Sequence, residues 1–206
     1  INEANLGGNK VNYYIARSAS QVVNIQSDNA VNETLTVAFK NSAPQGLGAQ
    51  GIYKNYLRFI LPLNATISSI QIDNQEQKIT PAITDPTIYE AKNFVPPAGL
   101  EVQKEDESGK TIYGFLATVE PQALQTIKIE YTLAQKINIS QPQLSYQLKV
   151  FKQPGIDFMP YNLSLNFPVN LKVVSADSDI KSSGQTAILS TQIVQDREVS
   201  INLAAK

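Results

Sequence analysis

The hydrophobic residues of this chain recur at every second position over most of its length. Residues 126–133 show the pattern most clearly, because polar residues there alternate with Ile127, Ile129, Tyr131 and Leu133. Successive side chains of a β-strand point to opposite faces, so this segment predicts a strand with one buried face. We find no long run with the period of a helix. The pattern predicts an all-β protein, an antiparallel β-sandwich with an immunoglobulin-like arrangement of strands.

Turn-forming residues divide the chain into short strands. Asp28-Asn29 and Asp106–Gly109 are strong turn signals, and each lies between two alternating segments. They predict two hairpins, the first formed by residues 11–26 and 31–41 and the second by residues 99–105 and 110–119. Further strands are predicted over residues 56–61, 67–72, 126–133, 144–152, 162–167, 171–175, 186–194 and 198–204.

Three segments between the strands have a different composition. Residues 44–51 contain three glycines and one proline, which predicts a loop. Prolines in residues 78–95 restrict that segment to an edge strand or an irregular connection, because proline cannot donate to a strand ladder. Residues 121–125 are compatible with one helical turn.

The domain organisation follows from composition. Residues 1–10 include Gly7-Gly8 and predict a flexible lead-in, and the polar, weakly patterned stretch 136–143 predicts a boundary. We therefore expect a first β-sandwich over residues 11–135 and a second, smaller part over residues 143–206. About five strands are few for an independent fold. The second part is expected to pack on the first, or to take a strand from the N-terminal segment.

The composition favours a scaffold over a catalyst. The 206 residues include 17 Lys and Arg, 18 Asp and Glu, and no His, Cys or Trp, for a formal net charge of −1. Without histidine, the commonest general base and Ser-His-Asp triads are excluded, and without cysteine so are disulfides. No segment concentrates positive charge, which argues against nucleic acid as a partner. We expect a non-enzyme with no cofactor.

The longest apolar run, residues 59–63, is far shorter than the roughly 20 residues that span a bilayer. The sequence begins at Ile1 and has no signal-peptide pattern. We therefore expect any membrane anchor to lie outside this chain.

Carboxylates are the candidate catalytic groups that remain. Glycosidases use two of them, and an acidic cluster on the second hairpin comprises Glu101, Glu105, Asp106 and Glu107. Charged residues at a hairpin tip are more often solvated turn residues.

Asp177 and Asp179 place oxygen ligands at alternate positions, as calcium-binding loops do, although the closing Glu of such loops is missing. A Ser/Asp/Gly turn explains the same residues.

Aromatic residues form another candidate site. A sugar-stacking platform could use Tyr13, Tyr14, Tyr53, Tyr56 and Phe59. Aromatic residues on strands are more often core or cross-strand partners, which is the alternative interpretation.

The sequence also contains candidate residues for two chemical modifications. An isopeptide crosslink needs a buried lysine, whereas strand parity places Lys40, Lys128 and Lys149 opposite the apolar residues. Glycosylation sequons occur at Asn32, Asn64, Asn138 and Asn162, a number close to what chance gives in a chain rich in Asn, Ser and Thr.

Long loops on rigid sandwiches are common contact surfaces. The segments 44–55 and 78–95 are the predicted ones. Candidate contact residues in the first are Gln45, Leu47, Tyr53, Lys54 and Asn55.

Several segments together resemble the C-terminal region of a bacterial family known as domain of unknown function four-zero-one-two. The matching segments are Ala4–Ile15, Leu35–Asn41, Tyr53–Pro62, Glu107–Gly114 and Lys152–Gly155, in the order of the family. The resemblance implies an N-terminal membrane anchor and an extracytoplasmic, β-rich body in Gram-positive and small-genome candidate-phylum bacteria. The family has no settled activity, so no catalytic residue is carried over. Turn geometry and strand packing are the expected roles of the matching positions Asn9, Lys10, Tyr56, Arg58, Lys152 and Gly155.

The expected function is that of a non-catalytic, extracytoplasmic ectodomain of a bacterial cell-surface protein, with a structural or adhesive role. Its partner would be a protein or a cell-wall glycan. The alternatives are a dedicated glycan or cell-wall binding module and a hydrolase that uses carboxylates alone.

Overall fold

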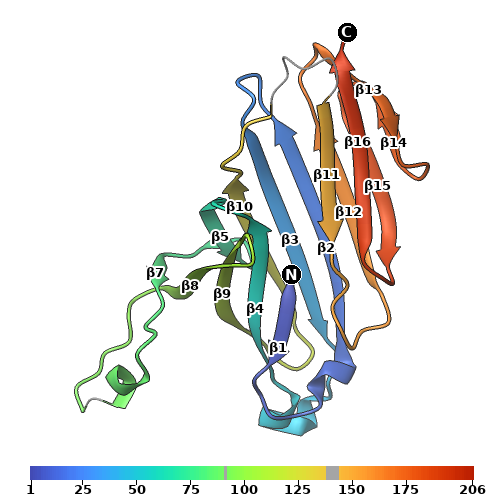
Figure 1. Cartoon of the computed structure of the whole chain (residues 1–206). Coiled ribbons are helices and arrows are strands. Elements are labelled where there is room, and N and C mark those ends of the chain that lie inside the picture. The colour runs from blue at the N-terminus through green and yellow to red at the C-terminus, as the bar shows by residue number, and fades with distance from the viewer. Residues whose placement is uncertain (91, 138–143) are drawn as a thin grey trace. The chain divides into compact units, whose positions relative to one another are not determined.

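The computed structural model describes residues 1–90, 92–137 and 144–206. These residues form an all-β sandwich, drawn in Figure 1, so the predicted fold class is confirmed. The immunoglobulin-like arrangement stays a prediction. Within the described residues, no helix has the length and apolar character needed to cross a bilayer.

The strands follow the predicted segments closely. Their bounds are β1 (Asn2–Asn5), β2 (Ile15–Ile25), β3 (Val31–Asn41), β4 (Tyr53–Pro62), β5 (Thr66–Ile72), β6 (Gln75–Glu76), β7 (Ile79–Pro81), β8 (Leu100–Glu107), β9 (Lys110–Val119), β10 (Leu124–Thr132), β11 (Leu144–Val150), β12 (Met159–Asn166), β13 (Leu171–Ala176), β14 (Lys181–Ser183), β15 (Thr186–Ile193) and β16 (Arg197–Ala205). The helical segments are short 3-10 turns, namely η1 (Val11–Tyr14), η2 (Gln45–Gly51) and η3 (Pro86–Glu90).

The strands form three sheets. Their orders are β1-β4-β9-β8-β7, β14-β15-β12-β2-β3-β10-β5-β6 and β11-β16-β13. Most pairs are antiparallel, as predicted, and two are parallel, namely β12 with β2 and β7 with β8. The C-terminal strand β12 pairs with β2 of the N-terminal segment, which is one of the two arrangements expected for the second part.

The chain divides into two compact units that interleave along the sequence. Unit 1 comprises Ile1–Ala16, Phe39–Ala65 and Ser69–Ile127, and unit 2 comprises Arg17–Ala38, Thr66–Ser68 and Lys128–Lys206. These units differ from the two consecutive parts, 11–135 and 143–206, that the sequence predicts, because β2 pairs with β12. Part of the predicted boundary, residues 138–143, lies outside the described residues.

Unit 1 has an aromatic core. The ring of Phe39 on β3 lies 6.3 Å from that of Tyr53 on β4, and Phe59 stacks on Phe115 at 5.7 Å between ring centroids. The hairpin of β8 and β9 closes through Ser108-Gly109, where both φ angles are positive, as a two-residue hairpin turn requires. The second predicted hairpin is therefore confirmed.

The alternation predicted for residues 126–133 is present in β10. Ile127, Ile129 and Tyr131 are all buried there, although Ile127 belongs to unit 1 and the other two residues belong to unit 2. Leu163 and Leu165 of β12 line the core of unit 2 in the same alternating way.

Three local predictions are wrong. The lead-in 1–10 contains β1, which pairs with β4, and the turn after β1 is held by Asn side chains rather than being flexible. Asn5 Oδ1 accepts from Gly7 N at 2.9 Å, and Asn9 Nδ2 donates to the carbonyl of Ile52 at 3.1 Å. Residues 11–14 form η1 rather than extended chain. Residues 121 and 122 form a turn with Gln122 at a φ of 64°, which is incompatible with a right-handed helical turn, and β10 begins at Leu124.

Candidate binding site

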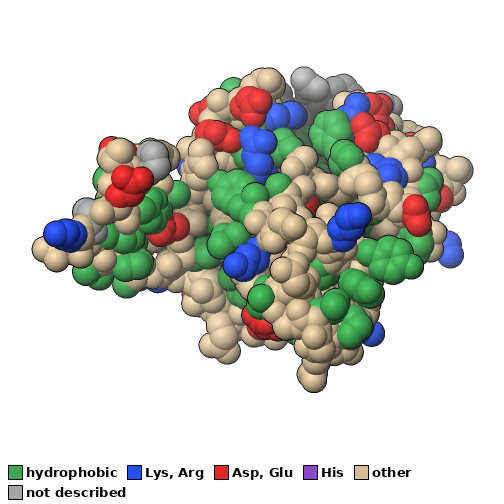
Figure 2. All heavy atoms as spheres, turned by 90° about the horizontal axis from the view of Figure 1, so that it is seen from below, with side chains coloured by type: hydrophobic (Ala, Val, Ile, Leu, Met, Phe, Trp, Pro, Cys, Tyr) green, Lys and Arg blue, Asp and Glu red, His purple; other side chains and the backbone are tan. Residues whose placement is uncertain are grey.

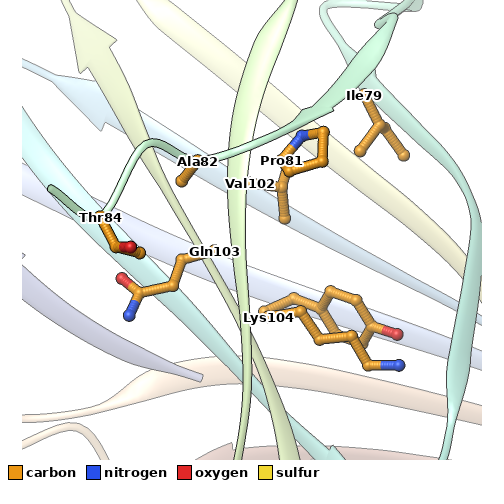
Figure 3. A pocket seen from close by; sticks show the side chains of 8 residues that line it. Ile79, Pro81, Ala82, Thr84, Val102, Gln103 and Lys104 are labelled. Atoms are coloured by element: carbon orange, nitrogen blue, oxygen red, sulfur yellow. The ribbon is translucent and has the colours of Figure 1, made fainter. Parts of the chain in front are cut away.

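A cleft of about 480 Å³ lies at the edge of the five-stranded sheet in unit 1. The parallel pairing of β7 with β8 is only three residues long, with Pro81 opposite Val102. After this pair the chain leaves the sheet, while β8 continues to Glu107. The cleft opens where β7 ends, and Figure 3 shows its side chains. They are Ile79, Pro81, Ala82, Thr84, Val102, Gln103, Lys104 and Tyr113.

An aliphatic and aromatic surface forms one wall of this cleft. Val102 and the ring of Tyr113 are buried, and Ile79 is largely exposed. Lys104 lies opposite Tyr113 in the hairpin, and its Nζ is 5.7 Å from the ring centroid, which is a cation–π contact. The Tyr113 hydroxyl donates to the carbonyl of Ala65 at 3.0 Å, so Tyr113 lines the cleft with its ring while its hydroxyl is engaged.

Residues 82–99, which we call the arm, leave the sheet beside this cleft; residue 91 of the arm lies outside the described residues. Glu101 ties the arm to β8, because its Oε2 accepts from the Tyr89 hydroxyl at 2.8 Å and from Ile83 N at 3.2 Å. The bond to Glu101 raises the pKa of Tyr89. Tyr89 and Phe94 are 4.8 Å apart between ring centroids. Residues 78–95 were predicted to form an edge strand or an irregular connection; the structure has an edge strand at β7 and an irregular connection in the arm.

The predicted carboxylates of this hairpin bind other groups of the protein. Glu105 and Glu107 both bind the Arg58 guanidinium, at 2.7 and 3.0 Å. Asp106 accepts from the buried Thr111 hydroxyl at 2.5 Å, and the Glu101 carboxylate holds the arm. Each carboxylate therefore has a structural partner, in keeping with the interpretation as hairpin residues.

The other predicted contact segment, residues 44–55, contains both exposed and buried residues in the structure. Gln45 and Leu47 lie in η2 and are exposed, as is Lys54. Tyr53 and Asn55 are buried, so their prediction as contact residues is wrong. The reason is that β4 begins at Tyr53, and alternate residues of that strand face the core.

The two calcium candidates bind an arginine. Arg197 donates to Asp179 Oδ1 at 2.8 Å and to Asp177 Oδ2 at 3.4 Å, and the latter oxygen also accepts from Ser200 N at 3.2 Å. Across residues 1–90, 92–137 and 144–206, no three His, Cys, Asp or Glu side chains gather closely enough to hold a metal ion.

The five candidate aromatic residues do not share one surface. Tyr53 and Phe59 face the core of unit 1, whereas Tyr56 is half-buried on the opposite face of β4. Tyr13 is 88% exposed and makes an edge contact with Tyr14 at 5.4 Å between centroids. The predicted platform is therefore reduced to the Tyr13–Tyr14 pair.

The candidate modification sites lie on the surface. Lys40 and Lys149 are exposed, and Lys128 forms an ion pair with Glu130 at 2.7 Å, so none of the three is a buried lysine. The sequon residues Asn32, Asn64 and Asn162 are exposed, and Asn138 lies outside the described residues.

The positions that match the family resemblance have structural contacts. Tyr56 donates to Gln103 at 2.8 Å and covers Gly114, where a Cβ atom would lie 2.5 Å from the Tyr56 hydroxyl. Lys152 Nζ donates to the carbonyl of Ile156, closing a turn in which Gly155 has a φ of 80°. These contacts agree with the expected roles in strand packing and turn geometry.

A buried carboxylate in unit 2 escaped the sequence analysis. Glu33 on β3 is only 5% exposed, and its Oε2 accepts from Tyr131 Oη at 2.6 Å and from Gln21 Nε2 at 2.5 Å. Tyr161 donates to Gln21 Oε1 at 2.7 Å. The hydroxyl of Tyr146 is buried as well and lies close enough to Glu33 to affect the pKa of that carboxyl. The sequence signal was available, because Glu33 shares its strand parity with apolar residues of β3.

Burial determines the ionisation of this cluster. It raises the pKa of Glu33, and this effect outweighs the interactions with Tyr131, Gln21 and Tyr146, which lower it. Burial and the nearby Glu33 also raise the pKa values of Tyr131, Tyr146 and Tyr161, so these phenols stay neutral at ordinary pH. Perturbed groups of this kind mark functional sites or structural networks. The direct hydrogen bonds favour a structural network here.

The fold and the cleft thus define an all-β sandwich protein with a concave, largely apolar site at a sheet edge. No family model and no curated protein matches the sequence. Among solved structures, a candidate nutrient-binding protein of Legionella pneumophila aligns with a TM-score of 0.59 and 11% identity, over 98% of this chain and 69% of that one. Yeast LTA4 hydrolase in complex with bestatin aligns with a TM-score of 0.50 and 8% identity, over 95% of this chain and 29% of that one. At these identities the likeness shows the fold alone.

Proposed function

We propose that this chain is a non-catalytic binding module of an extracytoplasmic protein on a bacterial cell surface, with a structural or adhesive role. In this proposal the sandwich supplies rigidity and the arm contacts a protein partner. The location rests on the resemblance to a bacterial surface family.

The observation that carries the binding role is the apolar surface of the arm. Ile88 and Tyr89 are exposed, and Val95 is 81% exposed. Figure 2 shows apolar side chains gathered on the part of the protein at the left of the view. Contiguous apolar surface of this kind marks interaction sites in soluble proteins. The bonds from Glu101 to the arm support the role further, because a loop that is already tied loses less conformational entropy on binding.

The solved structures support the proposal in one respect. The Legionella pneumophila protein that shares the fold is described by a binding role rather than by a reaction. The yeast hydrolase shares the fold over only 29% of its length, so its reaction gives no reason to assign catalysis to this chain.

The test compares wild type with a variant that carries Ile88→Ser, Tyr89→Ser and Val95→Ser. The matched control is Leu63→Ser with Leu124→Ser, which removes exposed apolar groups of unit 1 outside the arm. Labelled protein is added to intact cells of the bacterium that encodes it, before and after protease treatment of the cell surface. We expect saturable binding by wild type and control, and loss of binding in the arm variant and on protease-treated cells. Equal binding by the arm variant would overturn the role of the arm.

A glycan or cell-wall binding module is the second candidate, favoured by the exposed Tyr13 beside Tyr14. Its signature is binding that survives protease treatment and is lost in Tyr13→Ser. A glycan array with the wild-type chain distinguishes the two, because the proposed protein-binding role predicts no signal on the array.

A further inference from the structure

The cleft has an unbalanced positive charge. No carboxylate lies within 4.0 Å of Lys104 Nζ among the described residues, and the contact found for Lys104 is the one with the Tyr113 ring. Acids of the same hairpin have other partners: Glu105 faces Arg58, and Asp106 accepts from Thr111. The Lys104 ammonium therefore retains donors that a ligand can use.

The polar residue beside it is already engaged. Gln103 accepts from Tyr56 at 2.8 Å, and its amide donates to Glu105 at 3.4 Å. In Figure 3, Lys104 and Gln103 extend from opposite sides of β8, as neighbouring strand residues do. The charged group next to the apolar wall of Ile79 and Val102 is thus the Lys104 ammonium.

Size restricts the ligand. Small-molecule sites measure about 300–1,000 Å³ and combine an apolar lining with a few polar groups that fix orientation. The cleft, at about 480 Å³, lies in this range.

We propose that this cleft binds a small molecule that carries a carboxylate on an apolar body. The carboxylate pairs with Lys104 Nζ, and the apolar body lies against Ile79, Val102 and the face of Tyr113. This inference goes beyond the proposed function and does not depend on it, because it concerns a small ligand and not the protein partner of the arm.

The test is a titration of the whole chain with octanoate, followed by the backbone amide signals in NMR spectra. We expect saturable shifts at residues 79–82, 102–104 and 113, with a dissociation constant below about 10 mM. Octanamide keeps the apolar body and removes the charge, so it should bind about tenfold more weakly. Hexanoate should also bind more weakly, by up to about fourfold for each missing CH₂.

Variants test the charged group and the apolar wall of the cleft separately. Lys104→Gln should weaken the binding of octanoate about tenfold, whereas the affinity of Lys104→Arg for octanoate should stay within about threefold of wild type. Lys172→Gln, at an exposed lysine of β13 in unit 2, is the matched control and should leave binding unchanged. Ile79→Ser should reduce the affinity difference between hexanoate and octanoate. Melting temperatures of all four variants verify that they fold.

Several results would overturn the proposal. These are equal affinity for octanoate and octanamide, wild-type affinity in Lys104→Gln, or no shift of the cleft residues at about 10 mM octanoate. The proposal would also be overturned if the cleft bound an acetylated peptide that ends in leucine but did not bind octanoate. The cleft would then recognise the C-terminus of a peptide rather than a small molecule. A failure of the arm variant to lose cell binding would leave these expectations intact.

Discussion

Glu33 allows a direct test of how unit 2 tolerates a buried acid. Glu33→Gln keeps the shape and one carbonyl oxygen, which can accept from both Tyr131 and Gln21. It also supplies an amide donor close to the buried Tyr146 hydroxyl. The variant therefore removes the charge while keeping the network.

The sign of the pH dependence follows from linkage. Burial raises the pKa of Glu33 above the usual value of 4.5, so the unfolded chain releases this proton before the folded one does. The stability that the protonated Glu33 contributes is complete below that usual value and is lost as pH rises through the raised pKa. Wild type and Glu33→Gln should therefore be close in stability near pH 4. The variant should become increasingly the more stable of the two as pH rises towards 8.

Glu33→Leu measures how much the hydrogen bonds of Glu33 contribute to the free energy of unfolding. It leaves the Tyr131 hydroxyl buried without its acceptor, and it leaves Gln21 Nε2 only the 3.4 Å bond to Tyr131 Oη. Each buried group left unsatisfied costs about 1–3 kcal/mol. We expect a loss of about 2–5 kcal/mol in the free energy of unfolding, measured by urea denaturation monitored by circular dichroism. The other titrating groups are common to wild type and Glu33→Gln and cancel in their difference. A difference that stays constant from pH 4 to 8, or a Glu33→Leu variant as stable as wild type, would refute this account.

Three further predictions concern single side chains. Gly114→Ala should cost about 1–2 kcal/mol in unfolding free energy, because the new Cβ meets the Tyr56 hydroxyl at 2.5 Å; a Tyr56→Ser background should remove that cost. Asn55→Leu should stabilise the chain by about 1 kcal/mol in urea unfolding, because both amide atoms of Asn55 are buried and unpaired among the described residues; a net loss would point to a bound water. Arg197→Met should lower stability by at most about 1 kcal/mol, since its two ion pairs are partly exposed. Millimolar calcium should leave the melting temperature of wild type unchanged and raise it in Arg197→Met if the freed aspartates bind the ion.

The alternation of apolar residues was sufficient to predict most strands. In β10 it assigned the inward face correctly, because burial of one face is the dominant constraint on a half-buried strand. It failed at residues 1–10, where Gly7-Gly8 suggested flexibility but the side chains of Asn5 and Asn9 fix the turn. It could not predict the parallel pairing of β12 with β2, because distant pairing leaves no local signal.

The candidate site shows the same division between local and distant information. The Ser108-Gly109 turn fixes the register of the hairpin, and counting back from this turn places Lys104 opposite Tyr113. This pair could therefore have been predicted from the sequence. The contribution of Ile79 to the apolar wall could not have been predicted, because some twenty residues of intervening chain separate β7 from its partner β8. Glu33 was missed for another reason: a charged residue is normally assigned to the surface even when its parity points inward.

Glu33 and Lys104 show that strand parity alone does not decide what a charged side chain does. Both project from the same side of their strands as buried residues do, yet Glu33 lies in the middle of a sheet and Lys104 at the edge of another. In the middle, neighbouring strands bury the carboxyl group, and burial favours the neutral acid more strongly than the hydroxyl and amide donors favour the carboxylate. At the edge, β7 ends after three residues, so the ammonium keeps access to solvent and to the apolar wall beside it. A buried charge with protein partners is therefore best tested through stability, and an accessible charge without a carboxylate partner through binding.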